Sequence, residues 1–186
     1  MKINHLALKA IYLHEMDRFR RTLTQSLLSP VLTTSLYFIV FGSVIGGYVE
    51  KIDGISYGSY IVPGLLMLTL LTQSISNTSF GIFFPKFNGT IYEILAAPIS
   101  TFEVVLAFVG AGATKTLIVS IIIFITSLFF VDVQVKYPLL MIFLLILVAF
   151  TFALFGFLIG LISSDFEQMS IIPTLFVTPM VFLGGS

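Results

Sequence analysis

Ionisable side chains are scarce in the long apolar runs of this sequence, and Lys115 is the exception. An ionisable group inside a membrane-spanning helix is by default a candidate functional site, and an ammonium there could bind lipid phosphate. The alternative is that residues 108–114 still lie near the membrane interface, so that the Lys115 side chain snorkels to water. The apolar run after Lys115, residues 116–131, is just short of a full span, which favours the snorkelling interpretation.

A second set of polar side chains recurs at helical spacing within the apolar run at 59–84. It consists of Thr69, Gln73, Ser76 and Asn77, followed by Phe80. Such a face could line a substrate path, or it could form hydrogen bonds between helices at an interface. The sequence leaves both interpretations open.

Several kinds of chemistry are not expected from this chain. It has no cysteine, and its two histidines, His5 and His14, both lie in the polar N-terminal segment. This excludes thiolate metal sites and an intramembrane histidine site, so we expect no metal and no catalytic residue. No Walker A motif occurs, and Asp and Glu are expected only in loops, so neither ATP binding through a P-loop nor a proton relay is expected. Energy for transport would have to arrive from outside the membrane.

The composition is that of a membrane protein. The chain has 186 residues, of which 58% are hydrophobic and 10% charged, with a mean hydropathy of +1.10. Soluble domains carry about 25% charged residues. Apolar runs of about 20 residues therefore predict an all-α, polytopic membrane domain. The formal net charge is zero, so nucleic acid is not an expected partner.

The pattern predicts one domain, residues 1–186, with an N-terminal amphipathic helix over residues 1–28 and about five membrane spans. The expected spans are residues 30–49, 59–84, 104–131, 137–162 and 169–186. The last run stops without a polar flank, so we expect it to be incomplete and the chain to be a C-terminally truncated fragment.

The N-terminal helix is predicted from two opposite faces. Apolar residues follow one face, namely Leu6, Ala10, Leu13, Met16, Phe19, Leu23 and Leu27. Charged and polar residues follow the other, namely His14, Asp17, Arg18, Arg21 and Gln25. This pattern favours a helix lying in the headgroup plane, and the alternative is a solvated tail. We expect Pro30 to begin the next helix.

Lys and Arg predict the orientation. With the N-terminus in the cytoplasm, the inner side holds Lys2, Lys9, Arg18, Arg20, Arg21 and Lys86. The outer side then holds only Lys51 and Lys136. This bias places the polar segment at residues 85–103 in the cytosol.

That segment has helix signals of its own. Asn88 or Thr90 can cap a short helix, Glu93 lies in its first turn and Pro98 ends it. A few turn residues would suffice to join two spans, so we expect something outside the bilayer to contact this helix.

Five stretches carry a family resemblance. They are Glu15-Met16-Asp17-Arg18-Phe19-Arg20-Arg21, Ser29-Pro30-Val31-Leu32, Leu36-Tyr37-Phe38, Phe41-Gly42 and, above all, Gly89-Thr90-Ile91-Tyr92-Glu93-Ile94-Leu95-Ala96-Ala97-Pro98-Ile99-Ser100. The chain resembles the permease subunit of type-2 ABC exporters, the ABC-2 membrane family of drug, polysaccharide and nodulation-factor exporters. It is most similar to the small permeases of the bacterial inner membrane.

The resemblance implies a six-span permease that works as a dimer with separate ATP-binding subunits, which bind ATP and Mg. The N-terminal helix, with Arg18, Phe19 and Arg21, corresponds to an interfacial elbow. The segment with Gly89, Thr90, Glu93, Ile94, Leu95 and Ala97 corresponds to the coupling helix that contacts the ATPase.

The expected function is therefore export of a drug, lipid or glycan across the inner membrane. The alternatives are a lipid-modifying membrane enzyme and a non-transporting assembly subunit. The residues do not identify the substrate.

Overall fold

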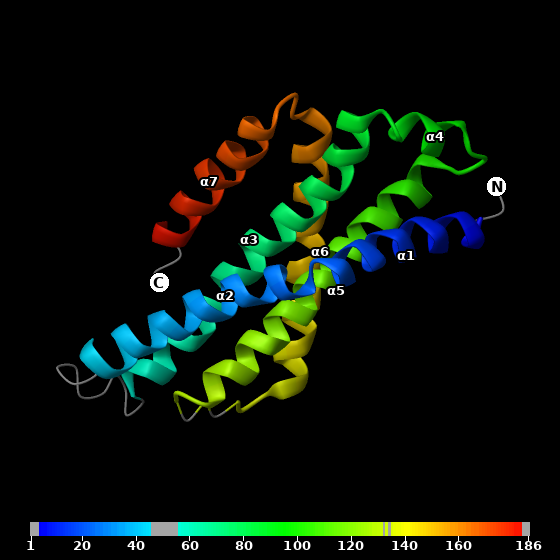
Figure 1. Cartoon of the computed structure of the whole chain (residues 1–186). Helices are drawn as coiled ribbons and strands as arrows, with labels where there is room; N and C mark the ends of the chain where they lie inside the picture. The colour runs from blue at the N-terminus through cyan, green and yellow to red at the C-terminus, as the bar shows by residue number, and fades with distance from the viewer. Residues whose placement is uncertain (1–3, 46–55, 132, 134, 184–186) are drawn as a thin grey trace.

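The computed structural model describes residues 4–45, 56–131, 133 and 135–183, and its regular elements are all helical (Figure 1). The prediction of an all-α chain is confirmed. In order along the chain the elements are α1 (His5–Arg21), α2 (Leu23–Tyr37), the π-helix η1 (Phe38–Ile45), α3 (Tyr57–Asn88), α4 (Ile91–Ala96), α5 (Thr101–Leu128), α6 (Pro138–Ile162) and α7 (Phe166–Leu183).

Four helical stretches among the described residues are long and apolar enough to cross a membrane. They are Leu23–Phe41, Tyr57–Asn88, Thr101–Leu128 and Pro138–Ile162. The second, third and fourth of these agree with the predicted spans. The predicted fifth span coincides with α7, whose described apolar stretch, Phe166–Val177, is shorter than a span. The predicted end of the first span near residue 49 lies outside the described residues, as do Lys2 and Lys51.

The break between the first two helices lies at Thr22, so the expectation that α1 continues to residue 28 is wrong. The Thr22 hydroxyl donates to the carbonyl oxygens of Arg18 and Phe19, and its backbone N–H points to the same two carbonyls. These bonds satisfy acceptors that the end of α1 would otherwise leave free. Pro30 does not begin the next helix but lies buried within α2.

The bundle is organised around α3, which packs against α5, α6 and α7 (Figure 1). Two glycines of α6 let it approach α3 closely. A Cβ added at Gly156 would lie 2.5 Å from the Ile75 carbonyl oxygen, and one at Gly160 would lie 2.4 Å from that of Ser79. This Gly-x-x-x-Gly spacing is typical of helix pairs packed within membranes.

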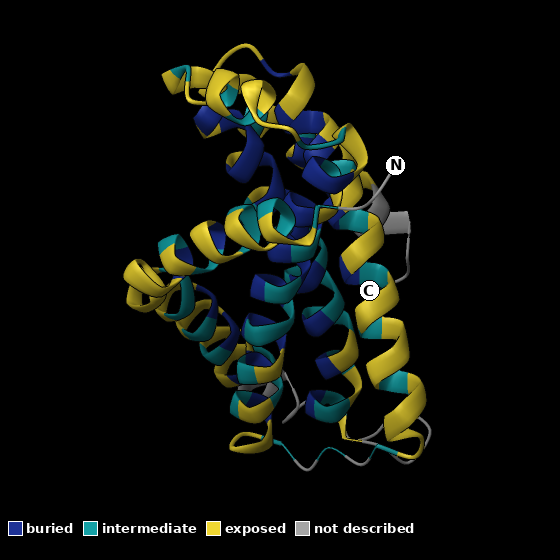
Figure 2. Ribbon diagram, turned by 90° about the vertical axis from the view of Figure 1, so that its right-hand side faces the viewer, coloured by how far each residue is buried: buried dark blue, intermediate teal, exposed yellow. Residues whose placement is uncertain are grey.

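Buried side chains gather where these helices meet, and the outward faces are exposed (Figure 2). The N-terminal helix departs from its predicted pattern. Leu6 and Leu13 are 82% and 47% exposed, whereas Glu15 and Phe19 are buried against the bundle. The buried face of α1 is therefore rotated from the apolar stripe that the sequence indicates, and only Phe19 belongs to both.

Candidate functional site

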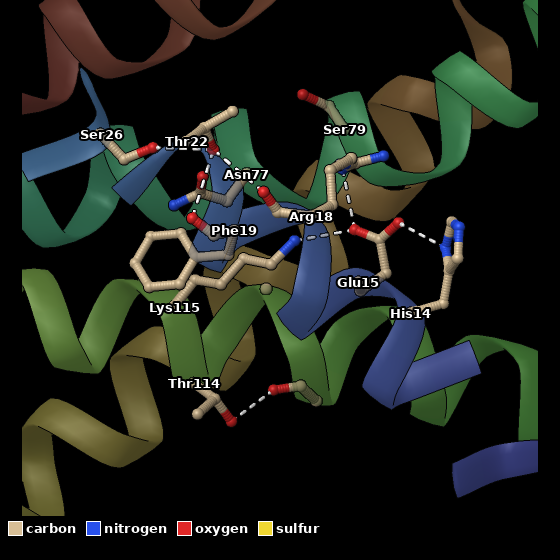
Figure 3. Close-up of polar contacts among 12 residues, drawn as sticks. His14, Glu15, Arg18, Phe19, Thr22, Ser26, Asn77, Ser79, Thr114 and Lys115 are labelled. Atoms are coloured by element: carbon tan, nitrogen blue, oxygen red, sulfur yellow. Dashed lines mark hydrogen bonds and ion pairs between the residues drawn. The ribbon is translucent and has the colours of Figure 1, made fainter. Parts of the chain in front are cut away.

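A buried ion pair joins α1 to the middle of α5. The Lys115 ammonium donates to Glu15 Oε2 at 2.7 Å, and both side chains are almost fully buried (Figure 3). The snorkelling interpretation of Lys115 is therefore wrong. Because a carboxylate is available on α1, the amine bonds to it and does not extend to the bilayer surface.

A second cation binds the same oxygen. Arg18 Nη2 lies 2.8 Å from Glu15 Oε2, and the Arg18 guanidinium lies 5.4 Å from the centre of the Phe80 ring, on α3. An arginine held in this way by a carboxylate and an aromatic face is fixed in position. The expectation that Arg18 lies on a solvated face is corrected, since it lies partly buried between α1 and α3 (Figure 3).

Glu15, Arg18 and Lys115 form a charged triad, and the two helices that carry them, α1 and α5, run side by side. The N-terminal half of α5 follows α1 through three contacts, each about a hundred residues apart in the sequence. Asn4 N donates to Glu103 Oε1, Tyr12 donates to Thr114 Oγ1 at 3.1 Å, and Lys115 donates to Glu15. Because α1 is fixed along its length, Glu15 and Arg18 have defined places beside α5.

A cavity of about 380 Å³ opens beside the triad. Its lining comes from α1, α2, the Thr22 corner, α3, α5 and α7. The lining residues are Arg18, Phe19, Thr22, Ser26, Ser76, Asn77, Ser79, Phe80, Lys115, Met169 and Ser170. Phe19, Ser79 and Lys115 are buried and form its floor, whereas Ser76, Phe80 and Ser170 are exposed at its mouth.

The polar face predicted on 59–84 divides between two roles. Ser76 and Asn77 line the cavity, and Asn77 Nδ2 lies 3.4 Å from Thr116 Oγ1 of α5. Thr69 donates to the Leu65 carbonyl oxygen within its own helix, and Gln73 accepts from Asn77. The structure thus brings Arg18, Phe19, Ser76, Asn77 and Lys115 together. Thr69 and Gln73 do not line the cavity.

The short helix predicted between the second and third spans is present as α4. Gly89, with φ of 79°, ends α3, and the Thr90 hydroxyl donates to the Pro85 carbonyl oxygen at 3.4 Å. Glu93 and Leu95 are exposed, and so is Ala97 just beyond the helix, whereas Ile94 packs against the main core cluster. Ile94 is half-buried, so only part of its side chain is available for the external contact that the resemblance implies.

Both ends of the α4 segment are tied to the bundle. On one side, the Lys86 ammonium donates to the carbonyl oxygens of Leu161 and Ser163, at the C-terminal end of α6. On the other, Glu103 accepts from the Ser100 and Asn4 backbone N–H groups. These links connect the two flanks of α4 to α6 and α1.

Sequence reasoning missed Glu15, Lys86 and Glu103 as binding groups. For Glu15 a signal existed, because Tyr12, Glu15 and Phe19 recur at helical spacing and all face inward. Its partner a hundred residues away could not be identified from that spacing.

The model of the ABC-2 type transporter family matches residues 7–186. The chain belongs to the ABC-2 type transporter family. The predicted resemblance is therefore confirmed, and the bundle described above is the membrane domain of an ABC-type transporter.

Relatives of this ABC-2 chain include the inner membrane transport permease YadH of Escherichia coli K12. It is 39% identical over 185 residues, which are 100% of this chain and 72% of that protein. Nodulation protein J of Rhizobium leguminosarum bv. viciae is 21% identical over 183 residues, covering 95% and 69% of the two chains. Nodulation protein J of Rhizobium meliloti is 23% identical over 181 residues, covering 95% and 68%. No solved structure gave a significant match.

Proposed function

We propose that this chain is the permease subunit of an ATP-driven exporter of the bacterial inner membrane. A separate subunit binds ATP and Mg, and a second copy of the permease completes the transporter. The name of the relative YadH supports the membrane location and the transport role. The positive-inside bias supports a cytoplasmic N-terminus, which places α4 on the cytosolic side.

The observation that carries the proposal is the exposed face of α4. Tyr92 and Leu95 are 73% and 67% exposed, and Glu93 lies between them in sequence on the same short helix. A six-residue helix is marginal alone, so its position depends on the packing of Ile91 and Ile94 against the bundle. Exposed apolar and acidic groups on a supported helix fit a protein partner outside the membrane.

The contacts on either side of α4 give a route for its movement. When the ATPases close, they displace α4 together with the adjoining ends of α3 and α5. Lys86 then carries the displacement to α6, and Glu103 carries it to α1. Rigid helices linked in this way can convert a small shift at one end into opening of the bundle at the other.

No observation favours the two alternatives, a lipid-modifying enzyme and a non-transporting assembly subunit. Among the described residues no group of three or more His, Cys, Asp and Glu side chains is placed so that it could hold a metal ion. Asp165 and Glu167, the other exposed acidic residues at this end, are surface groups.

The test is co-purification with the ATP-binding subunit. We expect Glu93→Arg and Leu95→Asp to reduce recovery of the ATPase by about tenfold or more, because both alter the exposed face of α4. Glu167→Arg is the matched control, since it reverses an exposed charge on α7, next to the α6–α7 turn. It should leave recovery unchanged.

A second control separates docking from folding. Ile94→Asp should lower the amount of folded permease, because Ile94 packs against the core cluster. Leu95→Asp should leave that amount unchanged. If the wild-type permease never retains an ATP-binding subunit, the proposed function is wrong.

A further inference from the structure

The charges beside the cavity do not balance. Arg18 and Lys115 supply two positive charges, and Glu15, bonded to both, supplies one negative charge. Among the described residues, the cavity lining contains these two cations and no acidic residue. One positive charge therefore remains at a site within the membrane domain, where an uncompensated charge is costly.

The donors of Arg18 are not exhausted by Glu15. A guanidinium carries five N–H groups in a rigid fork, and the described contacts use Nη2 on one carboxylate oxygen. Its side chain is 26% exposed, and it is a lining residue of the cavity. The ion pair with Glu15 and the contact with the Phe80 ring hold the Arg18 guanidinium in place. Its remaining N–H groups can therefore donate to a ligand in the cavity.

The rest of the lining suits a ligand with both a polar and an apolar part. Ser76, Asn77 and Ser170 bring hydroxyl and amide groups, whereas Phe19, Phe80 and Met169 bring apolar surface. A volume of about 380 Å³ is within the range of small-molecule sites. Three lining residues of α3 and α7, Ser76, Phe80 and Ser170, are exposed, so a ligand can enter beside them.

We propose that this cavity binds the phosphate group of an anionic amphiphile, with Arg18 as the main ligand-binding residue and Lys115 completing the charge. Glu15 positions both cations, and its single negative charge offsets only one of them. A cationic ligand would be repelled by the residual positive charge, and a neutral ligand would leave it uncompensated. As an assignment of the exported substrate, the inference rests on the transport function proposed above, whereas binding itself needs no ATPase.

The test measures lipid binding to the purified permease in a neutral detergent, without the ATPase. Native mass spectrometry follows titration with dioctanoyl phosphatidylglycerol, with dioctanoyl phosphatidylcholine as the zwitterionic comparison. Inorganic phosphate is added as competitor. We expect the anionic lipid to bind about tenfold or more tightly than the zwitterionic one, because its headgroup has a net negative charge, whereas the choline ammonium of the other lipid offsets its phosphate.

The variants locate the site. Arg18→Gln should weaken anionic-lipid binding by about tenfold or more, and Arg18→Lys should have a smaller effect because it keeps the charge but loses the fork. Arg20→Gln is the matched control, an exposed arginine of the same helix, and should bind as the wild type does. Ser76→Phe keeps every charge and fills the exposed edge of the cavity, so it should weaken binding by steric exclusion. It provides a second test of the site that does not depend on the folding of Arg18→Gln.

Each outcome decides the proposal. Strong competition by inorganic phosphate would support it and show that the phosphate group alone is recognised. Weak competition with strong lipid binding would support it and show that the apolar tail is needed. Equal binding of the two lipids would overturn it, as would equal losses in Arg18→Gln and Arg20→Gln. Retention of the ATPase is measured separately, so failure here leaves the proposed coupling role of α4 intact.

Discussion

The Lys86 ammonium donates to the Ser163 carbonyl oxygen at 2.8 Å, so a side chain from the last turn of α3 caps the C-terminal end of α6. The last carbonyl groups of a helix have no partners within the helix and carry partial negative charge. A lysine that bonds two of them, at Leu161 and Ser163, stabilises both the helix end and the turn into α7.

Lys86→Gln should therefore loosen the α6–α7 turn. We expect the apparent stability to fall by about 1 kcal/mol, because a charge-assisted bond at a partly exposed helix end is lost. Hydrogen exchange measured by mass spectrometry should rise in peptides covering residues 159–168. Lys9→Gln removes an exposed lysine of α1 and serves as the control. Unchanged exchange at the turn would show that Lys86 does not hold it.

Glu103→Gln tests the link between α1 and α5. The carboxylate accepts from the Asn4 and Ser100 N–H groups, and Ser100 in turn accepts from Glu103 N, completing a capping box. The neutral amide is a weaker acceptor, so the first turn of α1 should open more often. Hydrogen exchange at residues 5–9 should increase, while Glu167→Gln should leave it unchanged. Equal exchange in both variants would contradict the link.

The sequence was sufficient to predict the second, third and fourth spans, because apolar runs with polar ends leave few alternatives in a membrane. It was also sufficient to predict α4, where a capping residue (Asn88 or Thr90), the first-turn acid Glu93 and Pro98 lie close together. The break at Thr22 was not predicted, although Arg18, Arg20 and Arg21 are typical of a helix C-terminus. Pro30 was the stronger helix-boundary signal and was misleading, since α2 accommodates it internally.

The site was less predictable than the fold, because its contacts join residues far apart in the chain. Helical spacing predicted one polar face on α3, and of its polar residues Ser76 and Asn77 line the cavity, whereas Thr69 and Gln73 do not. Lys115 was recognised as unusual, but its partner lies on α1, and periodicity within one helix contains no information about another helix. Arg18 was assigned to the solvated face because charged residues usually lie there, and here an ion pair with Glu15 outweighs that tendency.

The buried triad predicts an asymmetry between its members. Glu15→Gln leaves both Arg18 and Lys115 without a counter-charge, so we expect a loss of about 3–5 kcal/mol in apparent stability. Lys115→Met should lower the apparent stability by less, because Glu15 still has Arg18 as its counter-charge. The double variant Glu15→Gln/Lys115→Met should recover part of the loss, since it removes one of the two unpaired cations.

These variants are compared by heating the detergent-solubilised protein and measuring the fraction that remains monodisperse on size-exclusion chromatography. Asp17→Asn, an exposed acid on the same helix, should match the wild type. If Lys115→Met proves as damaging as Glu15→Gln, Arg18 does not compensate Glu15 and the two-cation description fails.

Close packing of α6 on α3 gives the last prediction. Gly156→Ala and Gly160→Ala would each place a methyl group within about 2.5 Å of an α3 carbonyl oxygen, so the helices must separate. We expect each to cost about 1–3 kcal/mol, the usual cost of overpacking. Gly110→Ala is the matched control on α5, because its nearest neighbour, Tyr12, lies 4.0 Å away. It should be neutral or slightly stabilising, since alanine favours a helix more than glycine does. If all three substitutions have the same effect on thermal stability, the α3–α6 contact is not as close as the structure shows.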